Sequence, residues 1–268
     1  MNETITVPTN GKHPSYLDYQ GKHKGFLGWI LSTDHKRIGI LYLISILSFF
    51  LVGVTFGFLI RLELIAPGRT IVDPQTYNAF FTLHGVIMVF LFLIPAVPAI
   101  FGNFFLPILI GARDVSFPRL NLLSWYLYII GGLLAILSIV APGGAADTGW
   151  TFYIPYSVRT GTNVIYALFA AFVLGFSSIL TGINFVTTVH RLRAPGMTWF
   201  KTPLSVWSIY STAWVQVLVT PIIGITLLLV IIERTFNVGL FDPALGGDPV
   251  LFQHLFWIYS HPAVYIMI

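Results

Sequence analysis

The residues of this sequence whose types could support chemistry lie in apolar surroundings. The strongest candidates are found among the last thirteen residues, 256–268. Residues 256–268 are apolar enough for a bilayer, yet they hold His261, two tyrosines and a serine. His261 and Tyr265 are four residues apart, so a helix would place both side chains on one face. Pro262 removes a helix donor and is expected to kink the backbone there. An imidazole at membrane depth is costly, which makes His261 a candidate functional residue.

His84 is the second candidate ligand, within Thr82-Leu83-His84-Gly85 near one end of another apolar run. Two imidazoles without neighbouring acids suit the ligation of a metal ion or of haem iron, and a porphyrin can fill an apolar gap between helices. Gly85 favours this interpretation because it lets a flat ring approach closely. The alternative is that each histidine only hydrogen-bonds another helix. The residues alone leave both interpretations open.

A further set of polar side chains lies toward the opposite ends of the apolar runs. Ser177, Thr181 and Asn184 follow a spacing that puts them on one helix face. Hydroxyl and amide groups can hold a chain of waters that relays protons. The alternative is that they join helices, as such side chains often do in membranes. The candidate path consists of Asp114, Asn103, Asn121, Asn184, Ser177, Ser178, Tyr259 and Ser260.

Arg61 and Glu63 lie at the end of the first apolar run, near the depth expected for His84. Their spacing favours a pair of charges that extend to the membrane interface. The functional alternative is that Arg61 donates to a polar substituent of a bound cofactor.

The elements that must position these residues are membrane-spanning helices. Of 268 residues, 56% are hydrophobic and 9% are charged, with a mean hydropathy of +0.83; a soluble domain has roughly 25% charged residues. The absence of cysteine excludes disulfides, thiolate metal sites and iron–sulfur clusters. We expect a polar segment over residues 1–31 and an all-α, polytopic transmembrane bundle over residues 32–268. Its six predicted spans are about residues 38–62, 79–110, 122–141, 163–189, 204–232 and 250–268.

The uneven distribution of basic residues predicts the orientation of these spans. Ten of the 14 Lys and Arg residues fall on the side of the N-terminus and four on the other side. The positive-inside rule then places the N-terminus in the cytoplasm. The formal charge of +4 is explained by this distribution and requires no nucleic acid. Residue 268 ends the sixth run without a polar flank, so we expect the sequence to be the front part of a longer protein.

With these residues in place, the sequence resembles subunit I of the haem–copper oxidases, of the cytochrome c oxidase type. The resemblance runs from about Trp29 to the last residue, and its specificity comes from many ordered motifs at family spacing. These motifs are 32–36 (STDHK), 59–63 (LIRLE), 82–85 (TLHG), 101–104 (FGNF), 111–119 (GARDVSFPR), 149–151 (GWT), 246–249 (GGDP), 253–257 (QHLFW) and 261–265 (HPAVY).

The resemblance implies a role for each candidate. His84 corresponds to an axial ligand of the low-spin haem, and His261 to one of three histidines on the copper ion that faces the oxygen-binding haem. Tyr265 corresponds to the tyrosine that is cross-linked to that histidine. Arg61 corresponds to the partner of the low-spin haem's formyl group, with Trp150 as a second cofactor-binding residue. The path that begins at Asp114 corresponds to the family's D-channel, lined by Asn103, Asn121, Asn184, Ser177 and Ser178.

One departure from the common family pattern concerns the end of that path. Many members carry Glu where Ala263 stands, whereas Tyr259 and Ser260 resemble the branch that replaces Glu by a Tyr-Ser pair. One helical turn brings Tyr259 close to the face of Ala263. A hydroxyl would then pass on the proton. Leu122 is a smaller departure, because many members have a second Asn there.

The resemblance implies a respiratory terminal oxidase that reduces dioxygen to water with electrons from cytochrome c and pumps protons. It implies a-type haems, copper, and partner subunits II and III, in a bacterial inner membrane with lipid around twelve spans in all. The remaining metal ligands would lie beyond Ile268, so this piece alone is expected to be inactive. A quinol oxidase or a nitric oxide reductase-like member is the alternative within the family. A six-helix channel or transporter without cofactors is the alternative of another class.

Overall fold

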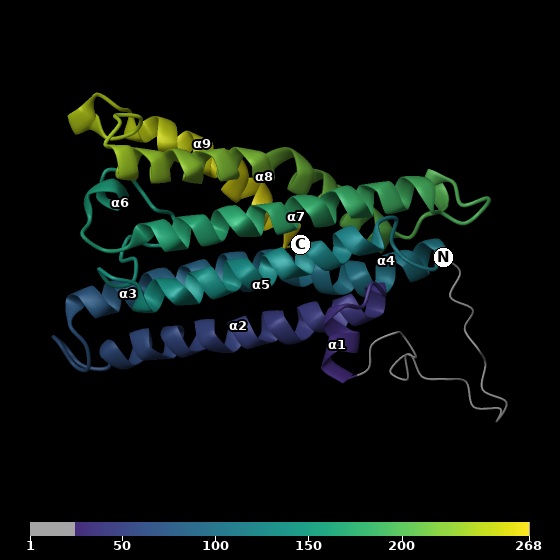
Figure 1. Cartoon of the computed structure of the whole chain (residues 1–268), viewed down its shortest axis with the longest axis horizontal. Coiled ribbons are helices and arrows are strands. Elements are labelled where there is room, and N and C mark those ends of the chain that lie inside the picture. The colour runs from purple at the N-terminus through teal and green to yellow at the C-terminus, as the bar shows by residue number, and fades with distance from the viewer. Residues whose placement is uncertain (1–24, 268) are drawn as a thin grey trace. The chain divides into compact units, whose positions relative to one another are not determined.

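The computed structural model describes residues 25–267, which form helices joined by loops (Figure 1). The chain divides into two units, and the first contributes helix α1 (Gly25–Ile30). The rest of the predicted polar segment, residues 1–24, lies outside the described residues. The second unit begins at Thr33 and contains all the other described elements. No strand forms within residues 25–267, so the predicted all-α class is confirmed.

Among residues 25–267, five helices are long and apolar enough to cross a membrane by length and composition. The second of them is one continuous helix made of α3 (Pro74–Val86), the wider π-helical turns η2 (Ile87–Leu93) and η3 (Ala96–Gly102), and α4 (Asn103–Ile110). The others are α2 (His35–Glu63), α5 (Pro118–Val140), α7 (Val164–Arg191) and α8 (Leu204–Phe236).

The sixth predicted span is also helical. Helix α9 (Pro249–Ile266) matches the expected position but does not belong to the five long apolar helices, because it carries several polar side chains. Its crossing of the membrane remains a prediction. The short elements α6 (Tyr156–Arg159), η4 (Trp199–Lys201) and η5 (Pro243–Leu245) lie in the loops.

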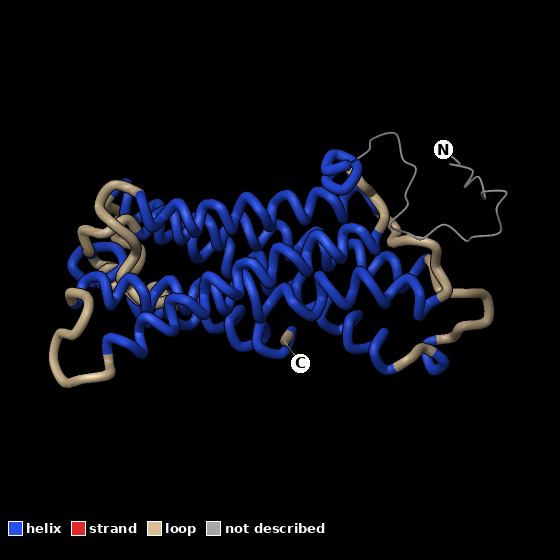
Figure 2. Tube along the Cα trace, turned by 90° about the horizontal axis from the view of Figure 1, so that it is seen from below, coloured by secondary structure: helices blue, strands red, loops and turns tan. Residues whose placement is uncertain are grey.

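Within the second unit, consecutive spans pack against one another. Helix α2 packs against the α3–α4 helix and α5, α5 against α7, α7 against α8, and α8 against α9 (Figure 1). The connecting loops gather at the two ends of the helices (Figure 2). Loops 64–73, 141–163 and 237–248 therefore share one end, which we call the outer end. Loops 111–117 and 192–203 share the other, inner end, where Ala194 N–H donates to the Ile110 carbonyl at 2.8 Å.

The helix starts follow from local chemistry. Asp34 accepts hydrogen bonds from the backbone N–H groups of Lys36 and Arg37, which caps α2. Asp73 and Asp248 cap α3 and α9 in the same way, each followed by a proline at the first helical position.

Prolines in the second span produce wider turns rather than a break. Pro95 has no N–H, so the Leu91 carbonyl four residues earlier loses its helical donor. The Tyr128 hydroxyl donates to that carbonyl at 2.7 Å. Pro107 leaves the Asn103 carbonyl in the same position, and His35 Nδ1 donates to it at 2.5 Å. The backbone is thus satisfied by side chains from neighbouring helices, as the apolar membrane interior requires.

Candidate functional site

His84 is held in one orientation by helix α2. Its Nδ1 lies 2.8 Å from the Gly53 carbonyl oxygen. A carbonyl can only accept a hydrogen bond, so Nδ1 is the donor, and in the neutral imidazole Nε2 then carries the lone pair. The ring packs tightly on Gly57, where a Cβ atom would lie 2.9 Å from His84 Cε1. This orientation of a half-buried imidazole is the one that a metal-ligating histidine commonly has.

Trp150 packs against Gly85, the residue after His84, and occupies the space that this glycine provides. A Cβ atom at Gly85 would be 2.9 Å from Trp150 Cβ and Cδ1. The space beside Gly85 is therefore filled by an indole of the protein itself. The Trp150 ring also contacts Phe256 and Trp257 of α9, at centroid distances of 5.8 and 6.0 Å. Trp150 thus connects the His84 region to α9.

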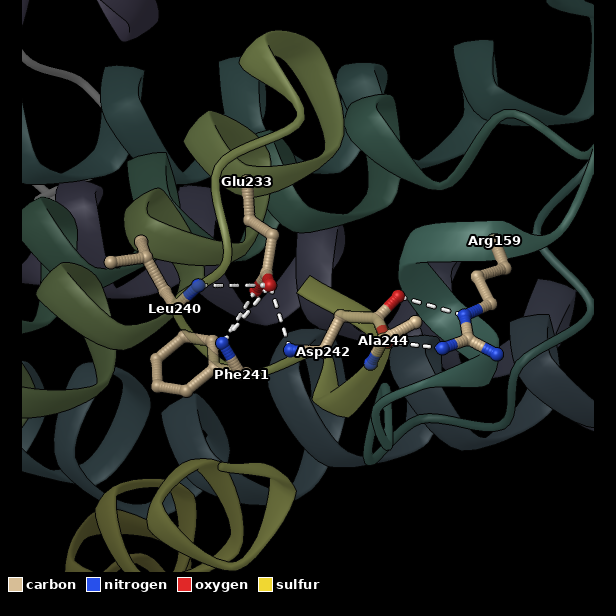
Figure 3. A network of polar contacts seen from close by, with 6 residues as sticks. All are labelled: Arg159, Glu233, Leu240, Phe241, Asp242 and Ala244. Atoms are coloured by element: carbon tan, nitrogen blue, oxygen red, sulfur yellow. Dashed lines mark hydrogen bonds and ion pairs between the residues drawn. The ribbon is translucent and has the colours of Figure 1, made fainter. Parts of the chain in front are cut away.

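The outer loops that carry Trp150 and the start of α9 are tied by a polar network (Figure 3). The Glu233 carboxylate accepts from the backbone N–H groups of Leu240, Phe241 and Asp242, at 2.8 to 3.2 Å. Arg159 forms an ion pair with Asp242, and this pair holds the pKa of the Asp242 carboxyl below its usual value. The network joins the loop before α7 to the loop before α9.

A second outer cluster surrounds Asp147. Burial alone would raise the pKa of its carboxyl, but hydrogen bonds from Tyr156, Thr162, Gln75 and Thr160 outweigh burial and lower it. Asp147 is therefore a charged anchor of the 141–163 loop. Arg234 of α8 donates to three backbone carbonyls of the same loop, those of Ser157, Thr160 and Thr162.

Arg61 and Glu63 do not pair as their spacing suggested. Glu63 is buried and accepts from the backbone N–H groups of Thr70, Ile71 and Val72, at 2.7 to 2.9 Å. Arg61 is exposed at the end of α2, and within residues 25–267 no ion pair involves it. Its guanidinium is thus available to another group.

Helix α9 has two different faces. Tyr259, Ser260 and Ala263 are buried against the bundle, whereas His261 and Tyr265 are exposed on the other face. The His261 and Tyr265 rings are 4.8 Å apart between centroids, at an interplanar angle of 77°. The predicted one-face arrangement of this pair is confirmed. Within residues 25–267, no group of three or more His, Cys, Asp or Glu side chains could hold a metal ion.

Part of the predicted inner path forms a continuous line of hydrogen bonds. Asn121 Nδ2 donates to Asn103 Oδ1 at 2.5 Å, and Ser124 Oγ donates to the Asn121 carbonyl at 2.7 Å. The Tyr42 hydroxyl lies 2.9 Å from Ser124 Oγ and 3.4 Å from Ser177 Oγ. Four helices therefore meet in one buried polar line.

That line leads to a small cavity in the middle of the bundle. The cavity has a volume of about 40 Å³, and the polar residues among those that line it are Tyr42, Ser177, Ser178, Thr181, Gln216 and Tyr259. About three water molecules fit such a volume. Within the described part of the chain, Ser178 Oγ and Gln216 Oε1 are buried without a hydrogen-bond partner. Such groups are normally satisfied by ordered water.

Other predicted members of the path lie to its side. Asn184 is bound to the Phe117 backbone, with its Oδ1 accepting from the N–H at 2.9 Å, and does not join the Asn103–Asn121 pair. Asp114 lies in the loop that follows α4, where burial raises the pKa of its carboxyl to about 7. Ser260 is buried beside Tyr259 but does not line the cavity.

Sequence reasoning missed three contributors, Tyr42, Ser124 and Gln216. Each is a polar residue inside an apolar run, which is the signal that could have drawn attention to them. His35 is another buried polar residue, since it is 1% exposed although it is the first residue of α2. The cause is the Asn103 carbonyl that Pro107 leaves unpaired, which holds the imidazole inside.

The fold and site define a polytopic α-helical membrane protein with an oriented histidine near one end and a buried polar line toward the other. A family model described as "Cytochrome C and Quinol oxidase polypeptide I" matches residues 37–268. The chain belongs to this family.

Curated relatives agree with the family match. The chain is 39% identical to "Cytochrome c oxidase subunit 1" of Cereibacter sphaeroides, over 91% of this chain and 49% of that protein. It is 38% identical to the protein of the same name from Thermostichus vulcanus, over 100% of this chain and 47% of that protein. A "Putative cytochrome c oxidase subunit 1-beta" of Streptomyces avermitilis is 42% identical, over 89% and 43%. The chain spans about half the length of these relatives.

Proposed function

We propose that the chain is the first half of the catalytic subunit of a respiratory terminal oxidase, which reduces dioxygen to water with electrons from cytochrome c and pumps protons. The observation that carries this proposal is the contact between His84 Nδ1 and the Gly53 carbonyl, in a chain of this family. It leaves Nε2 as the only ring nitrogen that can bind iron.

His84 would hold the iron of the low-spin haem, which we propose to be an a-type haem. The donor set fits, because a neutral imidazole with a bonded Nδ1–H is a strong axial ligand. Arg61 would donate to the haem formyl group, and its exposed guanidinium at the end of α2 supports this role. Trp150 would pack against the haem edge from its position beside Gly85.

His261 would supply one ligand of the copper ion that faces the oxygen-binding haem. Haem iron and copper supply the redox chemistry on dioxygen when they are bound. Tyr265, whose ring contacts that of His261, would be cross-linked to it and would give a proton and an electron from its hydroxyl. The remaining ligands would come from the other half of the subunit, so the 268 residues alone would be inactive.

The inner path would deliver protons from Asp114 past Asn103, Asn121 and Asn184 to the central cavity. There Ser177 and Ser178 would hold waters beside Tyr259, which lines the same cavity. Tyr259 and Ser260 would pass protons on in place of the missing carboxylate at Ala263. Tyr259 and Ala263 share the buried face of α9, which supports this replacement.

The membrane setting follows from the basic residues. We propose a bacterial inner membrane with the N-terminus in the cytoplasm, electrons that arrive at the outer end and protons at the inner end. Separating these sources stores roughly 2.3 kcal/mol per charge per 100 mV. Subunits II and III would be partners, with a cytochrome c or a cytochrome c domain as donor. A quinol donor is the second candidate, since the family description names both oxidases.

The test is the visible absorption spectrum of the purified complex that contains the complete subunit. We expect a-type haem bands, and His84→Ala should remove the low-spin component while His254→Ala, at an exposed site, should leave it. Loss of the same bands in both variants, or no haem bands at all, would contradict the proposal. Turnover with reduced cytochrome c but not with quinol would identify cytochrome c as the donor, and the opposite result would identify a quinol.

A further inference from the structure

The loop between α7 and α8 presents a bulky apolar side chain directly outward. Phe200 is 100% exposed and Leu204 is 85% exposed, at the ends of two membrane-spanning helices. Burying such a side chain is worth about 1.5–3 kcal/mol, so a Phe held in water is unfavourable. Phe200 lies in the loop that joins two candidate membrane spans, and aromatic residues near the ends of spans are typical of the membrane interface.

The same loop is held rigidly, so the exposure of Phe200 is built into the fold. Trp199 packs against the inner-end core, and its carbonyl accepts from Trp207 Nε1 at 3.2 Å. The Trp199 ring contacts the rings of His190 and Tyr210 at centroid distances of 5.2 Å each. The one-turn element η4 therefore turns Trp199 inward and Phe200 outward.

The loop is also strongly basic. Residues 190–203 contain Arg191, Arg193 and Lys201 but no acidic residue. The Arg193 guanidinium stacks on the Trp199 ring, with Cζ 3.8 Å from the ring centroid. A guanidinium fixed in this way, with the exposed Arg191 and Lys201 side chains on the same loop, fits a phosphate oxygen.

We propose that this loop binds the headgroup of an anionic phospholipid in the leaflet at the inner end. The Arg193 guanidinium binds the lipid phosphate, Arg191 and Lys201 add positive charge, and Phe200 and Leu204 insert among the acyl chains. The occupant is a lipid because an apolar wedge, interfacial aromatic rings and basic side chains at the end of two spans match the layers of a membrane surface. This site is separate from the proposed redox site and does not depend on it.

The test uses the purified complex with the complete subunit, exchanged into mixed micelles of phosphatidylglycerol and phosphatidylcholine. Binding of spin-labelled phosphatidylglycerol is measured by competition. Arg193→Gln should weaken the binding of phosphatidylglycerol by about fivefold to tenfold and leave the binding of phosphatidylcholine unchanged. Arg193→Lys should restore only part of the loss, because it keeps the charge but not the planar fork. Arg119→Gln, an equal loss of charge at an exposed inner-end position, should change binding less than twofold.

Phe200 provides a variant whose folding is not in question, because its side chain packs on nothing. Phe200→Ser should weaken the binding of both lipids. A photo-crosslinking residue at position 200 should form crosslinks to lipid. Equal effects of Arg193→Gln and Arg119→Gln would overturn the proposal, because they would show only a diffuse surface charge. Crosslinking of position 200 to a protein subunit would overturn it as well.

Discussion

Gly57→Ala tests whether the packing of α2 sets the position of the His84 ring. The added methyl carbon would lie 2.9 Å from Cε1, 3.1 Å from Nδ1 and 3.6 Å from Nε2 of the imidazole. Carbon atoms in favourable contact are about 3.5–4.0 Å apart. The ring must therefore move away by at least about 0.6 Å, and the movement is directed away from α2.

The same movement acts on the hydrogen bond that fixes the tautomer. The Nδ1 to Gly53 oxygen distance of 2.8 Å would lengthen past the usual limit of about 3.2 Å. Overpacking of this kind costs about 1–3 kcal/mol. Alanine returns up to about 1 kcal/mol of helix propensity relative to glycine. The net change in stability is therefore small, and the haem ligand geometry is the more sensitive measurement.

The assay is the absorption spectrum and midpoint potential of the low-spin haem in the complete complex. We expect Gly57→Ala to shift the midpoint potential of the low-spin haem. We also expect it to reduce the haem occupancy by about fivefold or more, because a loss of about 1 kcal/mol in binding free energy corresponds to about fivefold in affinity. Gly224→Ala is the matched control, because its added carbon would be 3.7 Å from the nearest Phe172 atom. An unchanged spectrum and potential in Gly57→Ala would refute the argument that this packing positions the ligand.

Three further predictions concern the proposed redox and proton-transfer residues. Tyr265→Phe should abolish oxygen consumption while the low-spin haem spectrum persists; normal turnover would exclude its role as donor. Tyr259→Phe combined with Ser260→Ala should slow proton uptake in stopped-flow measurements, whereas unchanged pumping would place the end of the path elsewhere. The pKa of Asp114 near 7 exceeds its unfolded value, so ionisation opposes folding as pH rises from about 4 to about 7. Asp114→Asn should therefore raise the melting temperature above pH 7 but not below pH 4, and an equal gain at both would contradict this linkage.

The positions of the helices could be predicted because their causes are local. The run expected over residues 38–62 is observed as α2, and its start is fixed by Asp34, a residue within one turn of the helix. The proline after Asp248 and the apolar run that follows predict α9 equally well. The contact between His261 and Tyr265 could also be predicted locally, because a spacing of four residues on a helix places two side chains on the same face.

The partners of buried polar groups could not be predicted, because they depend on contacts between distant residues. Glu63 illustrates this, since the nearby Arg61 was the expected partner and the backbone of residues 70–72 is the observed one. Three N–H groups satisfy a buried carboxylate better than one exposed, flexible guanidinium. The sequence contains both solutions, and only the loop conformation decides between them.

The prolines of the second span combine a local cause with contacts between residues that are distant in the sequence. In a membrane, the carbonyl four residues before each proline has to find a donor on another helix. Pro95 and Pro107 thereby select Tyr128 and His35, two residues whose burial the apolar pattern does not explain. The wider turns around Pro95 and Pro98 also line the cavity that Tyr259 lines. The prolines that interrupt the helical hydrogen bonds therefore lie both at the cavity wall and next to the polar contacts between helices, on the side of the second span where the proposed proton path would run.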